Sequence, residues 1–122
     1  MRTIEAVEIL RHERKVLITA CKVLRPASRA SRRHRSVHYG FTRSLEQQGF
    51  SRGEFIESAI RVRGALTQAI GALTGVKECP RRRSEARELK MYVRDLPRDA
   101  PNRDLRRKAL NAGISALVRR TA

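Results

Sequence analysis

Few residues in this sequence can do chemistry, and their spacing favours structural roles. His34 and His38 are four residues apart, a spacing that can bind a metal ion on one face of a helix. A zinc site needs three or four ligands, but no third ligand lies near them and the surrounding arginines repel a cation. Glu54 and Glu57 lie in the first turn of an expected helix, where the helix dipole stabilises carboxylates. We therefore expect no metal site and no acid–base pair.

The two cysteines, Cys21 and Cys79, do not form a disulfide framework. Cys21 lies in an apolar run and is expected to be a small core residue, whereas Cys79 lies in a short linker with no second cysteine near it. The sequence contains no nucleophile elbow, P-loop or glycine-rich dinucleotide turn. We therefore expect a protein that is not an enzyme and that carries no cofactor.

Positive charge is the dominant property of the chain. Its 28 Lys and Arg residues outnumber its 12 Asp and Glu residues, which gives a formal net charge of +16 and a pI near 11.6. Of these bases 23 are arginines, whose planar forks bind phosphates and carboxylates through two hydrogen bonds. Such a charge needs compensation by phosphates or by an acidic protein surface. Codon bias in a GC-rich genome is the alternative origin of the composition.

Two basic clusters are the candidate partner-binding sites. No acidic residue lies between Glu13 and Glu46, and the second cluster precedes an expected helix near residue 84. The candidate partner- or phosphate-binding residues are Lys22, Arg25, Arg29, Arg32, Arg33, Arg35, Arg81, Arg82 and Arg83. Only five Phe and Tyr residues are present, so we expect any RNA to be bound through its backbone and shape. A nuclear-localisation signal is an interpretation of the same clusters that stays open.

Apolar residues at spacings of three and four predict five helices, and no segment alternates in the manner of a strand. Four helices are expected over residues 4–25, 51–74, 84–96 and 102–118, and a weaker one carries Val37, Phe41 and Leu45. The expected core residues are Val7, Leu10, Leu17, Cys21 and Leu24, widened by Val16, Ala20 and Val23; then Phe55, Ala59, Val62, Leu66, Ile70 and Leu73; then Ala86, Leu89, Val93 and Leu96; and finally Leu105, Ala109, Ala112 or Gly113, Leu117 and Val118. Arg14 interrupts the first of these stripes, which predicts a solvated middle for that helix.

Local signals mark the helix ends and one expected close approach. The capping box Ser51–Glu54 opens the third helix, and Gly75 is a typical stop. Ser84 and Asn102 are expected N-caps of the last two helices. Gly64 and Gly71 lie two turns apart inside the third helix, where glycine costs about 1 kcal/mol relative to alanine. They are expected to let another helix or a ligand approach closely.

The sequence therefore predicts an all-α fold, a three-helix antiparallel bundle with one or two additional C-terminal helices. The expected division is a bundle over residues 1–76, a basic linker over 77–83 and a C-terminal helical hairpin over 84–122 that packs on the bundle. No apolar run approaches the roughly 18 residues that a transmembrane helix needs. Glu5 and Glu8 disfavour a cleavable, acidic-poor transit peptide at the start of the sequence.

The run VLITACKVLR, residues 16–25, resembles a known motif. Val16 and Leu17 before the centre, and residues 23–25 after it, fit the flanks of the pattern Val-Leu-x-Leu-Tyr-Arg-x-Leu-Leu-Arg, whose central triplet here is Thr-Ala-Cys. That pattern opens the mitochondrial LYR-motif proteins, small basic three-helix proteins related to accessory subunits of respiratory complex I. The basic segment and the capped third helix that follow are also similar, and RELKMYVRDLP, residues 87–97, resembles the same opening motif.

This resemblance implies the leading hypothesis, a non-enzymatic accessory or adaptor subunit of a large mitochondrial complex, on its matrix side. Lys22, Arg25 and Arg29 would contact an acidic acyl carrier protein, and Gly64 and Gly71 would leave room for its acyl chain. The alternative is a ribosomal or mitoribosomal protein whose arginine clusters bind rRNA phosphates. Nuclear and cytoplasmic locations also stay open.

Overall fold

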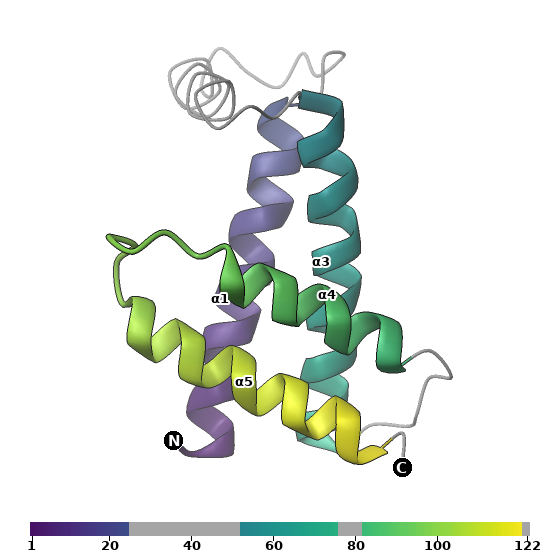
Figure 1. Cartoon of the computed structure of the whole chain (residues 1–122), viewed down its shortest axis with the longest axis vertical. Helices are drawn as coiled ribbons and strands as arrows, with labels where there is room; N and C mark the ends of the chain where they lie inside the picture. Colours follow the sequence, from purple (N-terminus) through teal and green to yellow (C-terminus); the bar gives the residue numbers. More distant parts are fainter. Residues whose placement is uncertain (25–51, 76–81, 121–122) are drawn as a thin grey trace.

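The chain is all-α over the part that the computed structural model describes, residues 1–24, 52–75 and 82–120. Its helices there are α1 (Thr3–Leu24), α3 (Arg52–Thr74), α4 (Arg82–Arg94) and α5 (Arg103–Arg120), and no strand occurs in those ranges (Figure 1). The predicted all-α class and the two additional C-terminal helices are therefore confirmed. The weaker helix expected around Val37, Phe41 and Leu45, the third member of the predicted bundle, lies outside the described residues.

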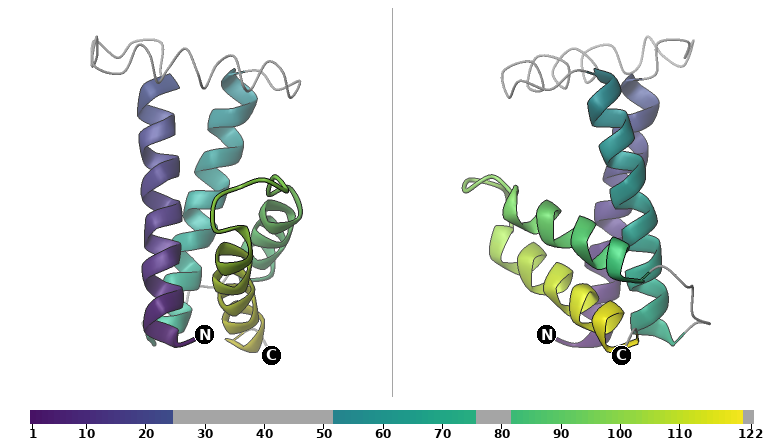
Figure 2. Two further views of the ribbon diagram at one scale, coloured as in Figure 1. Left: turned by 90° about the vertical axis from the view of Figure 1, so that its left-hand side faces the viewer. Right: turned by 45° about the vertical axis from the view of Figure 1, so that its right-hand side comes forward.

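The four helices form two crossed layers. The long helices α1 and α3 run antiparallel, and α4 and α5 form a second antiparallel pair that crosses one face of the first (Figures 1 and 2). Helix α5 contacts both α1 and α3, while α4 packs mainly against α3 and α5. The α4–α5 pair covers the part of α1–α3 that includes the start of α1 and the end of α3 (Figure 1). The other end of α1–α3 extends beyond it.

Helix α1 begins and ends within one residue of its predicted bounds. Leu10, Leu17 and Cys21 are buried as expected, but Val16 is 44% exposed, so its assignment to the core is wrong. The predicted wet middle is only partly solvated. Arg14 is half-buried, and its guanidinium donates a hydrogen bond to Thr67 Oγ1 at 3.3 Å.

Helix α3 matches its prediction most closely. Its expected core residues are buried or pack partly buried against the core, and the helix ends at Thr74 as predicted. Gly75 follows at φ 81°, the left-handed conformation that glycine adopts at little cost and that ends many helices. Ser51, the first residue of the expected capping box, lies outside the described residues.

The core face of α4 is confirmed, since Ala86, Leu89 and Leu96 are buried and Val93 packs partly buried against them. The helix begins at Arg82, two residues before the expected cap. Asn102 precedes α5 as predicted, at φ 54°, a left-handed conformation that asparagine tolerates better than most residues. Its carbonyl accepts a hydrogen bond from the Arg106 amide at 2.9 Å, which closes the first turn of α5.

The expected core face of α5 is partly wrong. Ala109 and Leu117 are buried as predicted, but Leu105 is 46% exposed and Val118 is 47% exposed. The sequence prediction omitted Leu110 and Ile114, which are buried instead. The true face follows Arg106, Leu110, Gly113 and Leu117 at helical spacing. This buried stripe starts with an arginine. A prediction that assigns only apolar residues to the core leaves that arginine out, and so rotates the expected buried face of α5 away from its true position.

A close approach between helices lies at Gly113. Gly64 is exposed, and a Cβ atom there would meet no atom of the described chain within 4 Å, so none of the described helices approaches closely at that glycine. A Cβ at Gly113 would meet Ala69 Cβ at 3.0 Å and Leu10 Cδ1 at 3.2 Å. Glycine at this position therefore lets α5 lie close to both long helices. Gly71 is half-buried.

Candidate functional site

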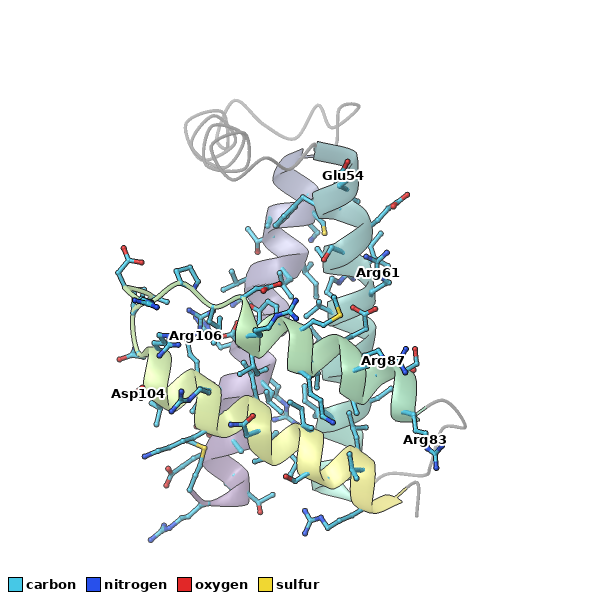
Figure 3. The ribbon with its side chains drawn as sticks, in the orientation of Figure 1. Glu54, Arg61, Arg83, Arg87, Asp104 and Arg106 are labelled. Atoms are coloured by element: carbon cyan, nitrogen blue, oxygen red, sulfur yellow. The ribbon has the colours of Figure 1, made fainter. Side chains whose placement is uncertain are left out.

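A buried polar cluster joins α1, α4 and α5. Glu13 of α1 is only 3% exposed. The Nε and Nη2 groups of Arg106 donate hydrogen bonds to its two carboxylate oxygens, the second at 3.0 Å, and the Tyr92 hydroxyl donates to Oε2 at 2.6 Å. Arg106 projects from the first turns of α5 toward this cluster (Figure 3). Glu13 lies beside Arg14, in the part of the helix that the sequence predicts to be solvated, and only the fold brings its two partners to it.

The electrostatics of this cluster hold it in one protonation state. Burial, and then the neighbouring Glu13 carboxylate, raise the pKa of Tyr92 well above its usual value of 10.0. The hydrogen bond to Glu13 raises the pKa of Arg106, outweighing burial. Tyr92 is therefore a neutral donor and Arg106 a cation at neutral pH. Both carboxylate oxygens of Glu13 are already acceptors, so the cluster acts as a lock between helices rather than as a base.

An apolar groove with a volume of about 620 Å³ lies beside this lock. It is bounded by α1 and α3 where they extend beyond the second layer, by the C-terminal half of α4, and by the chain between α4 and α5. Most of its lining is apolar: Val16, Leu17, Ala20, Phe55, Ala59, Val62, Met91, Leu96, Pro97, Ala100 and Pro101. Val16 and Met91 are 44% and 45% exposed, so large apolar side chains meet solvent on both sides of the groove.

The charged groups around the groove are mostly paired within the protein. The Glu88 carboxylate forms an ion pair with the Arg61 guanidinium at 3.4 Å, which joins α4 to α3. Asp95 lies 3.4 Å from Arg94 at the end of α4, and both side chains are well exposed. Arg106 also lines the groove but is held by Glu13. A smaller hollow of about 400 Å³ lies next to the same lock, between α1 and the start of α5.

A row of basic residues follows a different face of α4. Arg83, Arg87, Lys90 and Arg94 recur at intervals of four, three and four residues, and all four are exposed. Arg83 and Arg87 are visible toward the N-terminal end of the helix (Figure 3). We call these four residues the basic row. Its helical period is present in the sequence, next to the apolar face of Ala86 and Val93, but the predicted binding sites were the clusters of adjacent arginines.

Only two of the predicted partner-binding side chains fall in the described part of the chain. Lys22 is exposed in the last turn of α1, and Arg83 is exposed in the first turn of α4. Those two ends lie apart in the fold, so the structure does not bring Lys22 and Arg83 together (Figure 1). The predicted positions that lie outside the described residues are Arg25, Arg29, Arg32, Arg33, Arg35 and Arg81, together with the side chain of Arg82.

Metal binding and membrane insertion can be assessed for the described residues alone. No three His, Cys, Asp or Glu side chains come close enough there to hold a metal ion, and His34 and His38 lie outside those ranges. None of the described helices combines the length and apolar character needed to cross a bilayer. Cys21 is a buried free thiol, as predicted, and Cys79 is not among the described residues.

Comparison with known proteins gives no match: no family model, no curated protein and no solved structure is similar to this chain at a significant level. The features of this chain that bear on its function are therefore the groove, the lock and the basic row.

Proposed function

We propose that this chain is a non-enzymatic helical adaptor that binds the apolar face of a partner protein's helix in its groove. The observation that carries the proposal is the apolar lining of that groove, which continues the core outward between α1, α3 and α4. Large apolar patches on a protein surface commonly mark interaction sites. Val16 and Met91 stand on its two sides and lose exposed apolar surface once a helix is seated between them.

The chemistry of the lining favours a helix over a small substrate. Sites for small molecules combine an apolar pocket with a few convergent polar groups that orient the ligand. Here Glu88 is paired with Arg61, and Arg106 is held by Glu13, so these groups are engaged within the protein. An amphipathic helix needs mainly apolar contact along its length, which the groove offers. The lock at Glu13 keeps α4 and α5 placed against α1 and so keeps the groove open.

The resemblance to LYR-motif proteins extends the proposal to a large mitochondrial assembly of the respiratory complex I type. It rests on the run from Val16 to Arg25, and Val16, Leu17 and Ala20 of that run line the groove. An acyl carrier protein is one specific partner that the resemblance implies. Neither Gly64 nor Gly71 lines the groove, so an acyl chain bound there would not use the room those glycines leave.

Site-directed photo-crosslinking tests the proposal. p-Benzoylphenylalanine is placed at Met91, in the groove, or at Val118, which is exposed to a similar degree on α5. We expect Met91 to crosslink in the source cells to one subunit of a mitochondrial complex, identified by mass spectrometry, and Val118 not to. Crosslinks to ribosomal proteins alone would support the ribosomal alternative. Equal crosslinking at both positions, or none at Met91, would contradict the proposal.

A pair of substitutions tests the same proposal without a photoreactive residue. Val16→Asp places a charge on the groove wall, whereas Val118→Asp places the same charge on an equally exposed valine elsewhere. We expect the first variant to lose co-purification with the partner and the second to keep it. Both sites are near half exposure, so circular dichroism should show that both variants fold.

A further inference from the structure

The acidic and basic residues of α4 lie on different faces. Glu85 and Glu88 are half-buried on the side toward α3, where Glu88 pairs with Arg61. The basic row, Arg83, Arg87, Lys90 and Arg94, is exposed. At 3.6 residues per turn these four positions fall within an arc of about 60°, roughly a third of a turn from the groove-lining residues of the same helix.

The positive charge of the basic row is largely uncompensated within the described chain. Arg94 has one carboxylate within reach, that of Asp95, and both groups are mostly in solvent. Arg83, Arg87 and Lys90 form no ion pair with any residue that the structure describes. Like charges three and four residues apart destabilise a helix, so the row opposes the stability of α4 on its own. An anionic partner would remove that repulsion.

The helix that carries the row is also anchored in the core. Ala86 and Leu89 fix α4 in the core from the adjoining face, so the backbone beneath the bases is anchored. Residues 83 to 94 extend over about 16 Å at 1.5 Å per residue. A nucleic-acid duplex carries one phosphate per strand for about every 3.4 Å of its helix axis, so a row of this length matches the axial rise of four to five phosphates of one strand.

We propose that the basic row of α4 binds the phosphate backbone of a nucleic-acid duplex. This function goes beyond the adaptor role, because it uses a face of α4 that does not line the groove. A duplex fits better than a single strand, since single-strand sites add aromatic side chains on which bases stack. The described aromatic residues are Phe55 and Tyr92, which belong to the groove and the lock. Recognition is therefore through phosphates and independent of base sequence.

Fluorescence anisotropy of the full chain with 20-base-pair duplexes, one of RNA and one of DNA, across a series of NaCl concentrations tests this proposal. The test variant is Arg83→Gln/Arg87→Gln/Lys90→Gln/Arg94→Gln. The control, Arg2→Gln/Arg11→Gln/Lys15→Gln, removes three positive charges from exposed positions on or beside α1 that are not among the predicted binding residues.

We expect the row variant to bind at least about 30-fold more weakly near 0.1 M salt, and the slope of log K against log[NaCl] to fall by about 3 to 4. The α1 control should lose less than about 3-fold, since it removes distant charge only. Unequal affinity for the two duplexes identifies the preferred nucleic acid. Equal loss in the two variants, or an unchanged slope in the row variant, would overturn the proposal.

Three further variants or probes separate phosphate binding from loss of folding and from attraction to any polyanion. Lysines at the three arginine positions keep the charge, and this variant should bind within a few-fold of the natural chain. If the fourfold variant does not fold, Arg87→Gln/Lys90→Gln alone should lower the slope by about 2. Binding of poly-glutamate as tight as binding of either duplex would also overturn the proposal, because the row would then respond to negative charge of any kind.

Discussion

Two faces of the same short helix, α4, present opposite chemistry to solvent. The groove face carries Met91 with Glu88 and Asp95 nearby; Glu88 pairs with Arg61 of α3, and Asp95 lies 3.4 Å from Arg94 in solvent. The basic row carries four exposed bases, of which three have no acidic partner in the described chain. Among the described residues, one face therefore has no apolar side chain covering it and the other has little compensating negative charge. The contrast shows how a helix of 13 residues can present two surfaces of different chemistry.

The two faces depend on one buried anchor, the lock of Glu13, Tyr92 and Arg106. Helix α4 packs mainly against α3 and α5, and the hydroxyl of its Tyr92 donates a hydrogen bond to Glu13 of α1. Removing one partner of a buried ion pair leaves the other charge uncompensated, which is more damaging than the pair is stabilising. The first prediction therefore concerns stability.

Glu13→Gln should have one of the two largest effects of the changes considered. We expect a loss of about 3 kcal/mol in the free energy of unfolding, the lower end of the range for buried pairs, because Arg106 keeps part of its surface in water. Urea denaturation followed by circular dichroism measures it. Glu8→Gln, an exposed glutamate on the same helix, is the control and should change stability by less than about 0.5 kcal/mol. Similar losses in both variants would show that Glu13 is not a buried anchor.

A second prediction separates the core face of α4 from its groove face. Leu89→Ala should lower the free energy of unfolding by about 2–5 kcal/mol, because it empties a fully buried site. Met91→Ala, two residues on, should lower it by less than about 1 kcal/mol, since Met91 is already half in solvent. Thermal unfolding of the two variants compares them directly. A large loss for Met91→Ala would mean that the groove is closed in solution.

The third prediction concerns alkaline pH. The folded protein holds the Tyr92 proton more tightly than the unfolded chain does, because the pKa of Tyr92 is raised above its usual value of 10.0. The stability that the protonated Tyr92 contributes to the fold is thus complete below about pH 10, and it declines as the pH rises further. Tyr92→Phe should cost about 1 kcal/mol at pH 7 and make the decline between about pH 10 and 12 shallower. A decline as steep as that of the natural chain would contradict the assignment.

The smallest effect is expected at the basic row, and it has the opposite sign. Arg87→Gln/Lys90→Gln should raise the free energy of unfolding by about 0.3–1 kcal/mol at low salt, because it relieves repulsion along α4. The gain should vanish near 1 M NaCl, where the screening length is about 3 Å. Denaturation curves at the two salt concentrations measure this difference. A loss of stability at low salt would mean that these bases have acidic partners after all.

Much of the fold follows from apolar spacing alone. The bounds of α1, the core of α3 and the face of α4 were all predictable, because apolar residues recur there at helical spacing. The face of α5 was not, since its stripe begins with Arg106, which spacing rules assign to solvent. The burial of Glu13 was not predictable either, because spacing rules also assign a glutamate to solvent. A buried ion pair between residues distant in the sequence leaves no local signal, and only the packed structure shows it.

The candidate site was less predictable than the fold. The sequence predicts partner-binding sites at runs of adjacent arginines, and most of those arginines lie outside the described residues. The basic row has a helical period that could have been found, but a charged helical face is commonly only a solvated surface. The groove has no signal at all in the sequence. It exists because α4 and α5 leave one end of α1–α3 uncovered (Figure 2).

Crosslinking from both faces of α4 is the most direct test of the two proposed surfaces. The photoreactive residue is placed at Met91, on the groove, or at Lys90, the neighbouring position on the basic row, and crosslinked species are recovered from the source cells. We predict that Met91 captures a protein subunit of a larger assembly and that Lys90 captures nucleic acid, which nuclease treatment removes. Capture of the same partner from both positions would contradict the division of α4 into two binding faces.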